Sequence, residues 1–178
     1  SVYGASKLAA EAFIQAYSEY FDIRSLVYRF VSWIGERYSH GVVFDFVKKL
    51  LHNPRELEIL GDGTQTKSYL HVADGISGIF AALDNMSHKK NVVNLGHEEH
   101  MPVKDLARIV CEEMELHDTT YRFTGGCRGW IGDSPLVHLD ISQIRQTGFR
   151  PQISIADGIR RTVRYLRDNS WLLGARGV

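Results

Sequence analysis

The chain has 178 residues, of which 44% are hydrophobic and 11% aromatic, so it is long and apolar enough to form a globular core. Its 21 basic and 21 acidic side chains cancel, and neither sign is concentrated in a block, which argues against nucleic acid or an anionic membrane as a partner. No apolar run approaches the roughly 20 residues that span a bilayer, and the N-terminus does not resemble a signal peptide, so a cytoplasmic protein is expected.

The first segment, residues 4–21, has helical periodicity. Ala5, Ala9, Ala12 and Ala16 repeat at helical spacing and form a stripe of small side chains that would let a second helix approach closely. The chain enters this pattern at once, with no preceding strand or capping segment. Such a start is expected of a cut within a domain.

Beyond this helix, short apolar strands alternate with amphipathic helices. The expected elements, in chain order, are a buried parallel strand at residues 23–30, a polar loop at 35–41, a helix at 42–51, strands at 57–60 and 67–72 joined by an Asp-Gly turn, a helix at 74–86, a strand at 91–95, a helix at 103–116, strands at 120–123 and 136–139, a short helix at 141–147 and a last helix at 155–172.

This alternation is typical of an α/β protein with a mostly parallel sheet. A doubly wound nucleotide-binding domain carries a G-x-G-x-x-G fingerprint after its first strand, and the sequence has no such motif in that context. The pattern is therefore interpreted as the tail of a domain of this kind.

Tyr3 and Lys7 lie four residues apart at the start of the first helix, which places the phenol and the ammonium group on one face, one turn apart. A free phenol is too weak an acid to serve as a base at neutral pH, and a nearby cation favours the phenolate. An ordinary aromatic residue and an exposed lysine would give the same bare spacing. The spacing alone therefore does not define a site.

Six motifs follow one another along the chain. They are Y-G-A-S-K-L-A-A-E at residues 3–11, R-F-V-S-W-I-G at 29–35, L-E-I-L-G-D-G at 57–63, K-S-Y-L-H-V-A-D at 67–74, V-V-N-L-G at 92–96, and a G-D, D and G-F-x-P series within 132–151. In these motifs and their order, the chain resembles the extended short-chain dehydrogenase/reductase superfamily. The match is to its NAD-dependent nucleotide-sugar epimerases and dehydratases, from the catalytic tyrosine onward.

The resemblance implies roles for the first motif. In that family the tyrosine is the general base or acid on a sugar hydroxyl, the lysine holds the nicotinamide ribose and favours the phenolate, and NAD exchanges a hydride with the sugar carbon. Tyr3 and Lys7 would therefore be the catalytic residues and would also contact the NAD cofactor. The family's phosphate-binding loop and its catalytic serine or threonine precede the tyrosine, so the isolated chain is expected to be inactive.

The resemblance also implies a domain organisation. Residues 1–35 and 66–97 would be the remnant of a Rossmann-like domain whose N-terminal dinucleotide-binding half is absent. Residues 36–65 and 98–178 would form a smaller α/β substrate-binding domain. The family dimerises through the helix that carries the tyrosine, so a homodimer through residues 4–21 is expected.

Several positions depart from the family pattern. Ser32 stands where asparagine is usual, Glu36 where proline is common, and Lys67 in place of a frequent arginine. The arginine often found three residues before the C-terminal aspartate is replaced by Trp130, and the nearest arginine is Arg128. The aromatic ring could instead stack on a base or sugar. These changes bear on the substrate more than on the fold.

We nevertheless expect a substrate site for the diphosphate of a nucleotide sugar. Lys67 and Arg128 would supply the cations, Ser32 a hydrogen-bond donor and Asp133 a further contact. In the alternative, Lys67 and Arg128 are solvated surface charges.

Other polar clusters are weaker signals. The segment His97–His100 lacks the H-E-x-x-H spacing of a zinc site and is interpreted as a solvated loop, so no metal site is expected. Residues 124–129 are glycine-rich without the ending of a phosphate-binding loop, which favours a flexible segment beside the substrate. Cys111 is expected to be a buried structural thiol, while Cys127 lacks a histidine partner for nucleophilic catalysis.

Asp74 is as consistent with capping the helix that follows as with contacting a ligand. The terminal Trp171-Leu172-Leu173 indicates helix packing. Epimerases, dehydratases and decarboxylases of the family differ largely before the tyrosine, so the reaction type stays open. A non-catalytic binding or assembly module and a reductase of another small carbonyl compound are the alternatives, and Tyr3 with Lys7 argues against the first.

Overall fold

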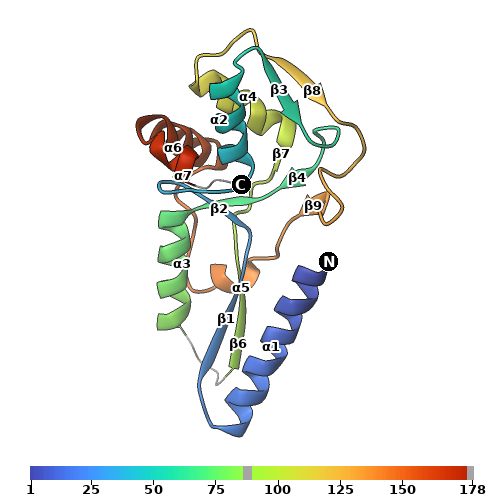
Figure 1. Cartoon of the computed structure of the whole chain (residues 1–178). Coiled ribbons are helices and arrows are strands. Elements are labelled where there is room, and N and C mark those ends of the chain that lie inside the picture. Colours follow the sequence, from blue (N-terminus) through green and yellow to red (C-terminus); the bar gives the residue numbers. More distant parts are fainter. Residues whose placement is uncertain (86–89, 176–178) are drawn as a thin grey trace.

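Figure 1 shows an elongated α/β molecule, of which the computed structural model describes residues 1–85 and 90–175. The helices are α1 (Val2–Tyr20), α2 (Val42–His52), α3 (Val72–Asp84), α4 (Val103–Glu113), α5 (Ser142–Arg145), α6 (Ile155–Asp168) and α7 (Trp171–Ala175). The strands are β1 (Ser25–Phe30), β2 (Ser32–Ile34), β3 (Glu56–Ile59), β4 (Thr66–Lys67), β5 (Tyr69–His71), β6 (Lys90–Leu95), β7 (Met101–Pro102), β8 (Thr120–Phe123) and β9 (Leu136–Val137). No helix of this part of the chain is both long and apolar enough to span a membrane.

Two successive strands, β1 and β2, pair with different partners, and β1 runs along the long axis of the molecule (Figure 1). β1 pairs in parallel with β6, and after Val31 the chain continues into β2, which pairs in parallel with β5. The parallel strand predicted at residues 23–30 is present as Ser25–Phe30. The prediction that this strand is buried is wrong, because its side chains are half-buried or exposed. On α1, which covers one side of β1, Ser18 is the single buried residue.

Two hydrophobic clusters form the core. The larger one lies at the upper end in Figure 1, where α2, α4 and α6 pack around β3 with fully buried side chains such as Leu106 and Ile159. Burial of a leucine or isoleucine side chain contributes roughly 1.5–3 kcal/mol. The smaller cluster joins β6 to α3 and α5 through Leu95, Ile144 and Phe149.

The predicted elements are present, but several boundaries differ. The strand expected at residues 67–72 is divided at Ser68: β4 pairs with β7 and β9, while β5 pairs with β2. The Ser68 hydroxyl donates to the carbonyl oxygens of His97 (3.1 Å) and Glu99 (2.8 Å) at this break. The last helix ends at Asp168 and is followed by the separate α7. The helix expected to end at Met86 ends at Asp84, and Met86 itself lies outside the described residues.

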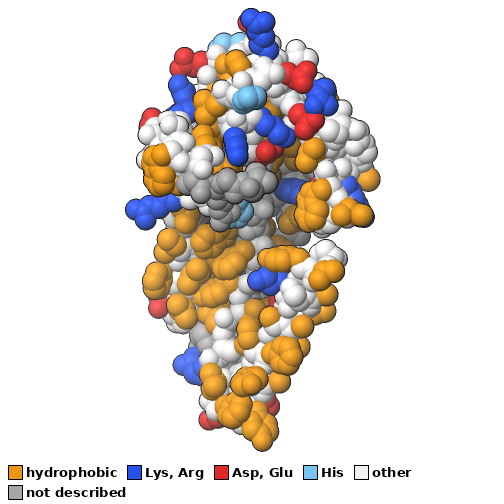
Figure 2. Space-filling model, viewed as in Figure 1, with side chains coloured by type: hydrophobic (Ala, Val, Ile, Leu, Met, Phe, Trp, Pro, Cys, Tyr) orange, Lys and Arg blue, Asp and Glu red, His pale blue; other side chains and the backbone are white. Residues whose placement is uncertain are grey.

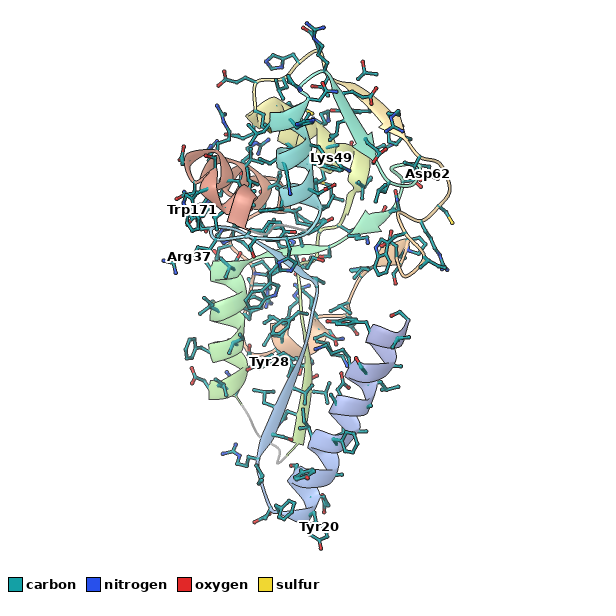
Figure 3. All side chains as sticks on the ribbon, viewed as in Figure 1. Tyr20, Tyr28, Arg37, Lys49, Asp62 and Trp171 are labelled. Atoms are coloured by element: carbon teal, nitrogen blue, oxygen red, sulfur yellow. The ribbon has the colours of Figure 1, made fainter. Side chains whose placement is uncertain are left out.

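The Asp-Gly turn is also present, although it joins strands that do not pair with each other. β3 pairs in parallel with β8 instead. Within the turn, the Asp62 carboxylate accepts a hydrogen bond from the Thr64 amide at 2.9 Å, and Gly61 and Gly63 have φ of 83° and 79°, which favour glycine. Asp62 lies at the outer edge of the molecule in Figure 3.

The structure tests the predicted packing of Cys111 and of the Trp171-Leu172-Leu173 segment. Cys111 is buried in the larger cluster, as predicted. In the Trp171-Leu172-Leu173 segment Leu173 is buried against the larger cluster, whereas Trp171 is 66% exposed, so its ring does not serve the packing role expected of it. The start of α1 differs as well: Ser1 caps the helix by accepting a hydrogen bond from the Gly4 amide at 3.1 Å.

Candidate functional site

The first turns of α1 hold Tyr3 and Lys7. The Lys7 ammonium nitrogen lies 5.3 Å from the centroid of the Tyr3 ring, so both groups share one face of the helix, within the range of a cation–π contact. Tyr3 is 71% exposed. The pair is therefore open to a ligand, and the rest of the described chain leaves it uncovered.

A bidentate ion pair fastens α1 to the sheet. Arg29 of β1 donates from Nε and Nη2 to the two carboxylate oxygens of Glu11, at 2.9 and 2.7 Å. The hydrogen bond from Arg29 holds the pKa of the Glu11 carboxyl below its usual value. Tyr3 precedes Glu11 by eight residues, or about 12 Å of helix. The ion pair therefore helps to fix the orientation of α1, and with it the position of Tyr3, relative to β1.

A cleft of about 390 Å³ lies beside α2, β4 and β5. Ser32, Lys67 and Asp133 line it, so the structure brings three of the four predicted substrate residues together. Arg128 has an exposed side chain and is not among the lining residues, although its neighbour Gly129 is. Other lining residues are Tyr38, Gly41, Val42, Asp45, Phe46, Leu60, Gln65, Tyr69, Val103 and Trp130.

Lys67 and Asp133 form an ion pair within this cleft. Asp133 is 8% exposed, and its second carboxylate oxygen accepts a hydrogen bond from the Gly129 amide at 3.0 Å. The carboxylate thus links β4 to the glycine-rich segment. A nearly buried carboxylate needs such partners, because burial without them is costly. An anionic ligand at Lys67 has to share this cation with Asp133.

Tyr38 is a cleft residue that the sequence did not reveal. Burial raises the pKa of its phenol to about 12, so the hydroxyl stays protonated at neutral pH. A Cβ at Gly41 would lie 2.0 Å from the Tyr38 hydroxyl oxygen, and Gly41 has φ of 96°, so both space and backbone require glycine there. Tyr38 sits in a segment that reads as a polar loop, and no periodicity marks it.

Asp74 and His71 have structural roles. The Asp74 carboxylate is buried and accepts a hydrogen bond from the Ile153 amide at 3.0 Å, so it tethers the segment before α6 and does not cap α3. The cap of α3 is His71, whose Nδ1 accepts from the Ala73 amide at 3.2 Å.

The His97–His100 segment is less solvated than predicted. His97 is buried, and its Nδ1 accepts from the Glu99 amide at 2.9 Å. The Glu99 carboxylate accepts from the Ile155 amide at 3.2 Å, and Glu98 pairs with Arg145 at 2.9 Å. Over residues 1–85 and 90–175, no group of three or more His, Cys, Asp or Glu side chains has a metal-binding arrangement.

The fold and this geometry define the class of the protein. Parallel strands covered by helices and a Tyr-x-x-x-Lys helix beside them are the parts of a Rossmann-like α/β protein.

Comparison with known proteins agrees. A crystal structure of UDP-galactose 4-epimerase superimposes with a TM-score of 0.84 at 32% identity, covering 96% of this chain and 55% of that one. The UDP-glucuronic acid 4-epimerase of Bacillus cereus, solved with UDP-glucuronic acid and NAD, gives 0.81 at 26% identity, covering 95% and 53%. A putative UDP-glucose 4-epimerase of Methanocaldococcus jannaschii is 30% identical over 96% of this chain and 54% of its own length. The human dTDP-D-glucose 4,6-dehydratase is 26% identical over 94% and 48%.

The sequence profile of the NAD dependent epimerase/dehydratase family matches residues 1–96, more than half of the chain. The chain belongs to this family. It spans about half the length of the relatives that it matches.

Proposed function

We propose that the chain is the C-terminal part of an NAD-dependent nucleotide-sugar epimerase or dehydratase. The observation that carries the proposal is the Tyr3–Lys7 pair on one open face of α1, in a chain that belongs to the NAD dependent epimerase/dehydratase family. The Bacillus cereus relative, solved with a nucleotide sugar and NAD, supports both the substrate class and the cofactor.

The chemistry follows from the two side chains. Oxidation of a sugar carbon that bears a hydroxyl removes the hydroxyl proton and a hydride from the carbon. Tyr3 accepts that proton, and returns it when the carbonyl is reduced again. Lys7, whose ammonium nitrogen lies 5.3 Å from the centroid of the Tyr3 ring, binds the nicotinamide ribose. NAD supplies the hydride acceptor.

The exposed Tyr3–Lys7 face fits a nicotinamide ribose, because both side chains are free to receive a ligand. The phosphate-binding part of an NAD site requires a G-x-G-x-x-G turn between a strand and a helix, and the sequence has no such motif in that context. We therefore expect the isolated chain to be inactive and to bind NAD weakly.

The cleft is proposed to hold the nucleotide diphosphate. Lys67 is its cation, Ser32 a donor and Asp133 the carboxylate that positions Lys67. Arg128, which does not line the cleft, would have to reach the diphosphate from the neighbouring glycine-rich segment, residues 124–129. In the same proposal residues 1–35 and 66–97 belong to the cofactor domain and residues 36–65 and 98–178 to the substrate domain. The enzyme is proposed to act in the cytoplasm.

The test is Tyr3→Phe in the complete protein. Removal of the hydroxyl should lower turnover by ~10²–10⁴-fold while substrate affinity stays near normal, because the hydroxyl acts in proton transfer. Tyr20→Phe is the matched control, since Tyr20 is an exposed tyrosine at the other end of the same helix (Figure 3). Full activity of Tyr3→Phe would remove Tyr3 from the mechanism.

A further inference from the structure

Gln65 is a cleft residue whose hydrogen bonding is incomplete. Its side chain is 3% exposed, yet it lines the cleft. Nε2 donates to the carbonyl oxygen of Leu60 at 2.7 Å, and a carbonyl only accepts, so this contact fixes which end of the amide is nitrogen. The other end, Oε1, is buried and has no hydrogen-bond partner among the described residues.

The surroundings hold Gln65 in place. Its backbone carbonyl accepts from the Val103 amide at 3.0 Å, and the Gly63 carbonyl accepts from the Lys104 amide at 3.0 Å, so the first turn of α4 anchors this loop. A Cβ at Gly61 would lie 1.9 Å from Gln65 Nε2. The amide is packed against backbone on that side, and Oε1 has little freedom to turn toward another partner.

Two other buried side-chain atoms make no hydrogen bond within the described residues, Trp33 Nε1 and His71 Nε2, although the Glu36 carboxylate lies 3.3 Å from the second. Neither residue lines the cleft. Gln65 therefore differs from them, because its unpaired atom belongs to a residue that a bound ligand would meet. An amide oxygen buried without a partner is costly, and a ligand that donates to it recovers this cost on binding.

The chemistry of Oε1 limits what can bind it. An amide oxygen only accepts, so phosphate and carboxylate oxygens are excluded. A cationic donor is disfavoured by Lys67, which lines the same cleft two residues away. Side chains two residues apart on an extended segment lie about 7 Å apart on one side. The ligand group that matches Oε1 is therefore a neutral O–H or N–H donor. If a diphosphate lies at Lys67, this donor lies about 7 Å from it, roughly the width of one sugar ring.

We propose that Gln65 Oε1 accepts a hydrogen bond from a ribose hydroxyl of the bound nucleotide, while Lys67 faces its diphosphate. The inference rests on the proposed function and adds a specificity-determining residue to it. Asp133 adjoins the same place, since a Cβ at Gly129 would lie 3.3 Å from Asp133 Oδ2 and 3.6 Å from Gln65 Nε2. The ribose would therefore lie against the glycine-rich segment.

The test combines ligand and protein changes in the complete protein. Calorimetry measures the affinity of UDP, GDP and dTDP; whichever binds is then compared with its forms that lack a 2′- or a 3′-hydroxyl. For the wild type, loss of the accepted hydroxyl should weaken binding about ten- to a hundredfold. Gln65→Leu should bind the ribonucleotide more weakly than the wild type does, by a similar factor. Its affinity for the deoxy form should be close to its affinity for the ribonucleotide.

Gln65→Met keeps the length of the side chain without an amide oxygen, so it should also lose the preference for the hydroxyl, which keeps the test decisive if Gln65→Leu fails to fold. Equal affinity of the wild type for all three sugars, or an unchanged hydroxyl preference in Gln65→Leu, would overturn the inference while leaving the proposed function intact. A wild type that binds none of the nucleoside diphosphates would contradict the proposed function, and this inference with it.

Discussion

At the scale of single residues, His71 is a buried ionisable group that also caps a helix. It is 3% exposed, and its Nδ1 caps α3 in the neutral form. Burial lowers the pKa of its imidazole below the ordinary value, and the charge of Arg161 acts in the same direction. Glu36, whose carboxylate lies 3.3 Å from Nε2, and Asp74 act in the opposite direction.

This balance gives a pH dependence with a definite sign. Because the folded pKa of His71 lies below its unfolded value of about 6.5, the neutral form contributes stability above that pH, and the contribution is lost as the pH falls toward the folded pKa. His71→Asn keeps a capping acceptor that does not titrate. Its midpoint of urea unfolding should fall less between about pH 7 and pH 5 than that of the wild type.

Glu36→Gln is the companion variant. Loss of the Glu36 charge removes an influence that raises the pKa of His71, so stability should fall more steeply with acid than in the wild type. Parallel pH profiles for the wild type and both variants would show that His71 does not titrate in this range.

At the scale of elements, the contact between α3 and β2 depends on one glycine. A Cβ at Gly75 would lie 2.6, 2.7 and 2.8 Å from three ring atoms of Trp33. An aromatic ring has no flexible end to move aside. Overpacking costs about 1–3 kcal/mol, and the gain in helix propensity offsets at most roughly 1 kcal/mol of it, so we expect Gly75→Ala to destabilise the protein by up to about 2 kcal/mol.

Gly174→Ala is the matched control. Gly174 also lies in a helix, α7, and its added Cβ would meet nothing within 4 Å. Thermal unfolding should show Gly174→Ala at or above the wild type and Gly75→Ala below it. Equal or higher stability of Gly75→Ala would show that Trp33 repacks freely.

Sequence periodicity was sufficient to predict these elements and insufficient to predict their partners. The 3.6-residue pattern identifies α2, α4 and α6 because each buries one apolar face in the larger cluster. The run from Lys67 to Val72 is uniformly strand-like, so nothing local marks the change of partner at Ser68. Lys67 and Asp133 were predicted as cleft residues from motif resemblance. Gln65 and Tyr38 are recognised as cleft residues only in the structure, where distant segments of the chain meet around the cleft.

At the scale of the whole molecule, the surface of α1 is unusually apolar. Figure 2 shows hydrophobic side chains over much of this helix and over α3. Large exposed side chains on α1 and just after it are Val2, Leu8, Phe13, Ile14, Tyr17, Tyr20 and Phe21. An apolar surface of this extent is typical of an interface.

We propose that α1 forms a homodimer contact along its alanine stripe, and Ala12→Glu tests this. A charged, longer side chain would prevent close helix approach, so sedimentation velocity should show a shift from dimer to monomer. Ala10→Glu carries the same change on the opposite side of the helix and should leave the dimer intact. A wild type that is monomeric, or a dimer that Ala12→Glu leaves unchanged, would rule out this interface.

The central claim is that the complete protein interconverts or dehydrates a nucleotide sugar with NAD, using Tyr3. The most direct measurement follows the products by NMR after the complete protein with NAD is given UDP-, dTDP- and GDP-linked hexoses. We expect at least one to be converted to an epimer or a dehydrated keto sugar, and the conversion to slow by ~10²–10⁴-fold in Tyr3→Phe. No conversion of any nucleotide sugar by a folded, NAD-bound protein would contradict the account, as would equal conversion by the wild type and Tyr3→Phe.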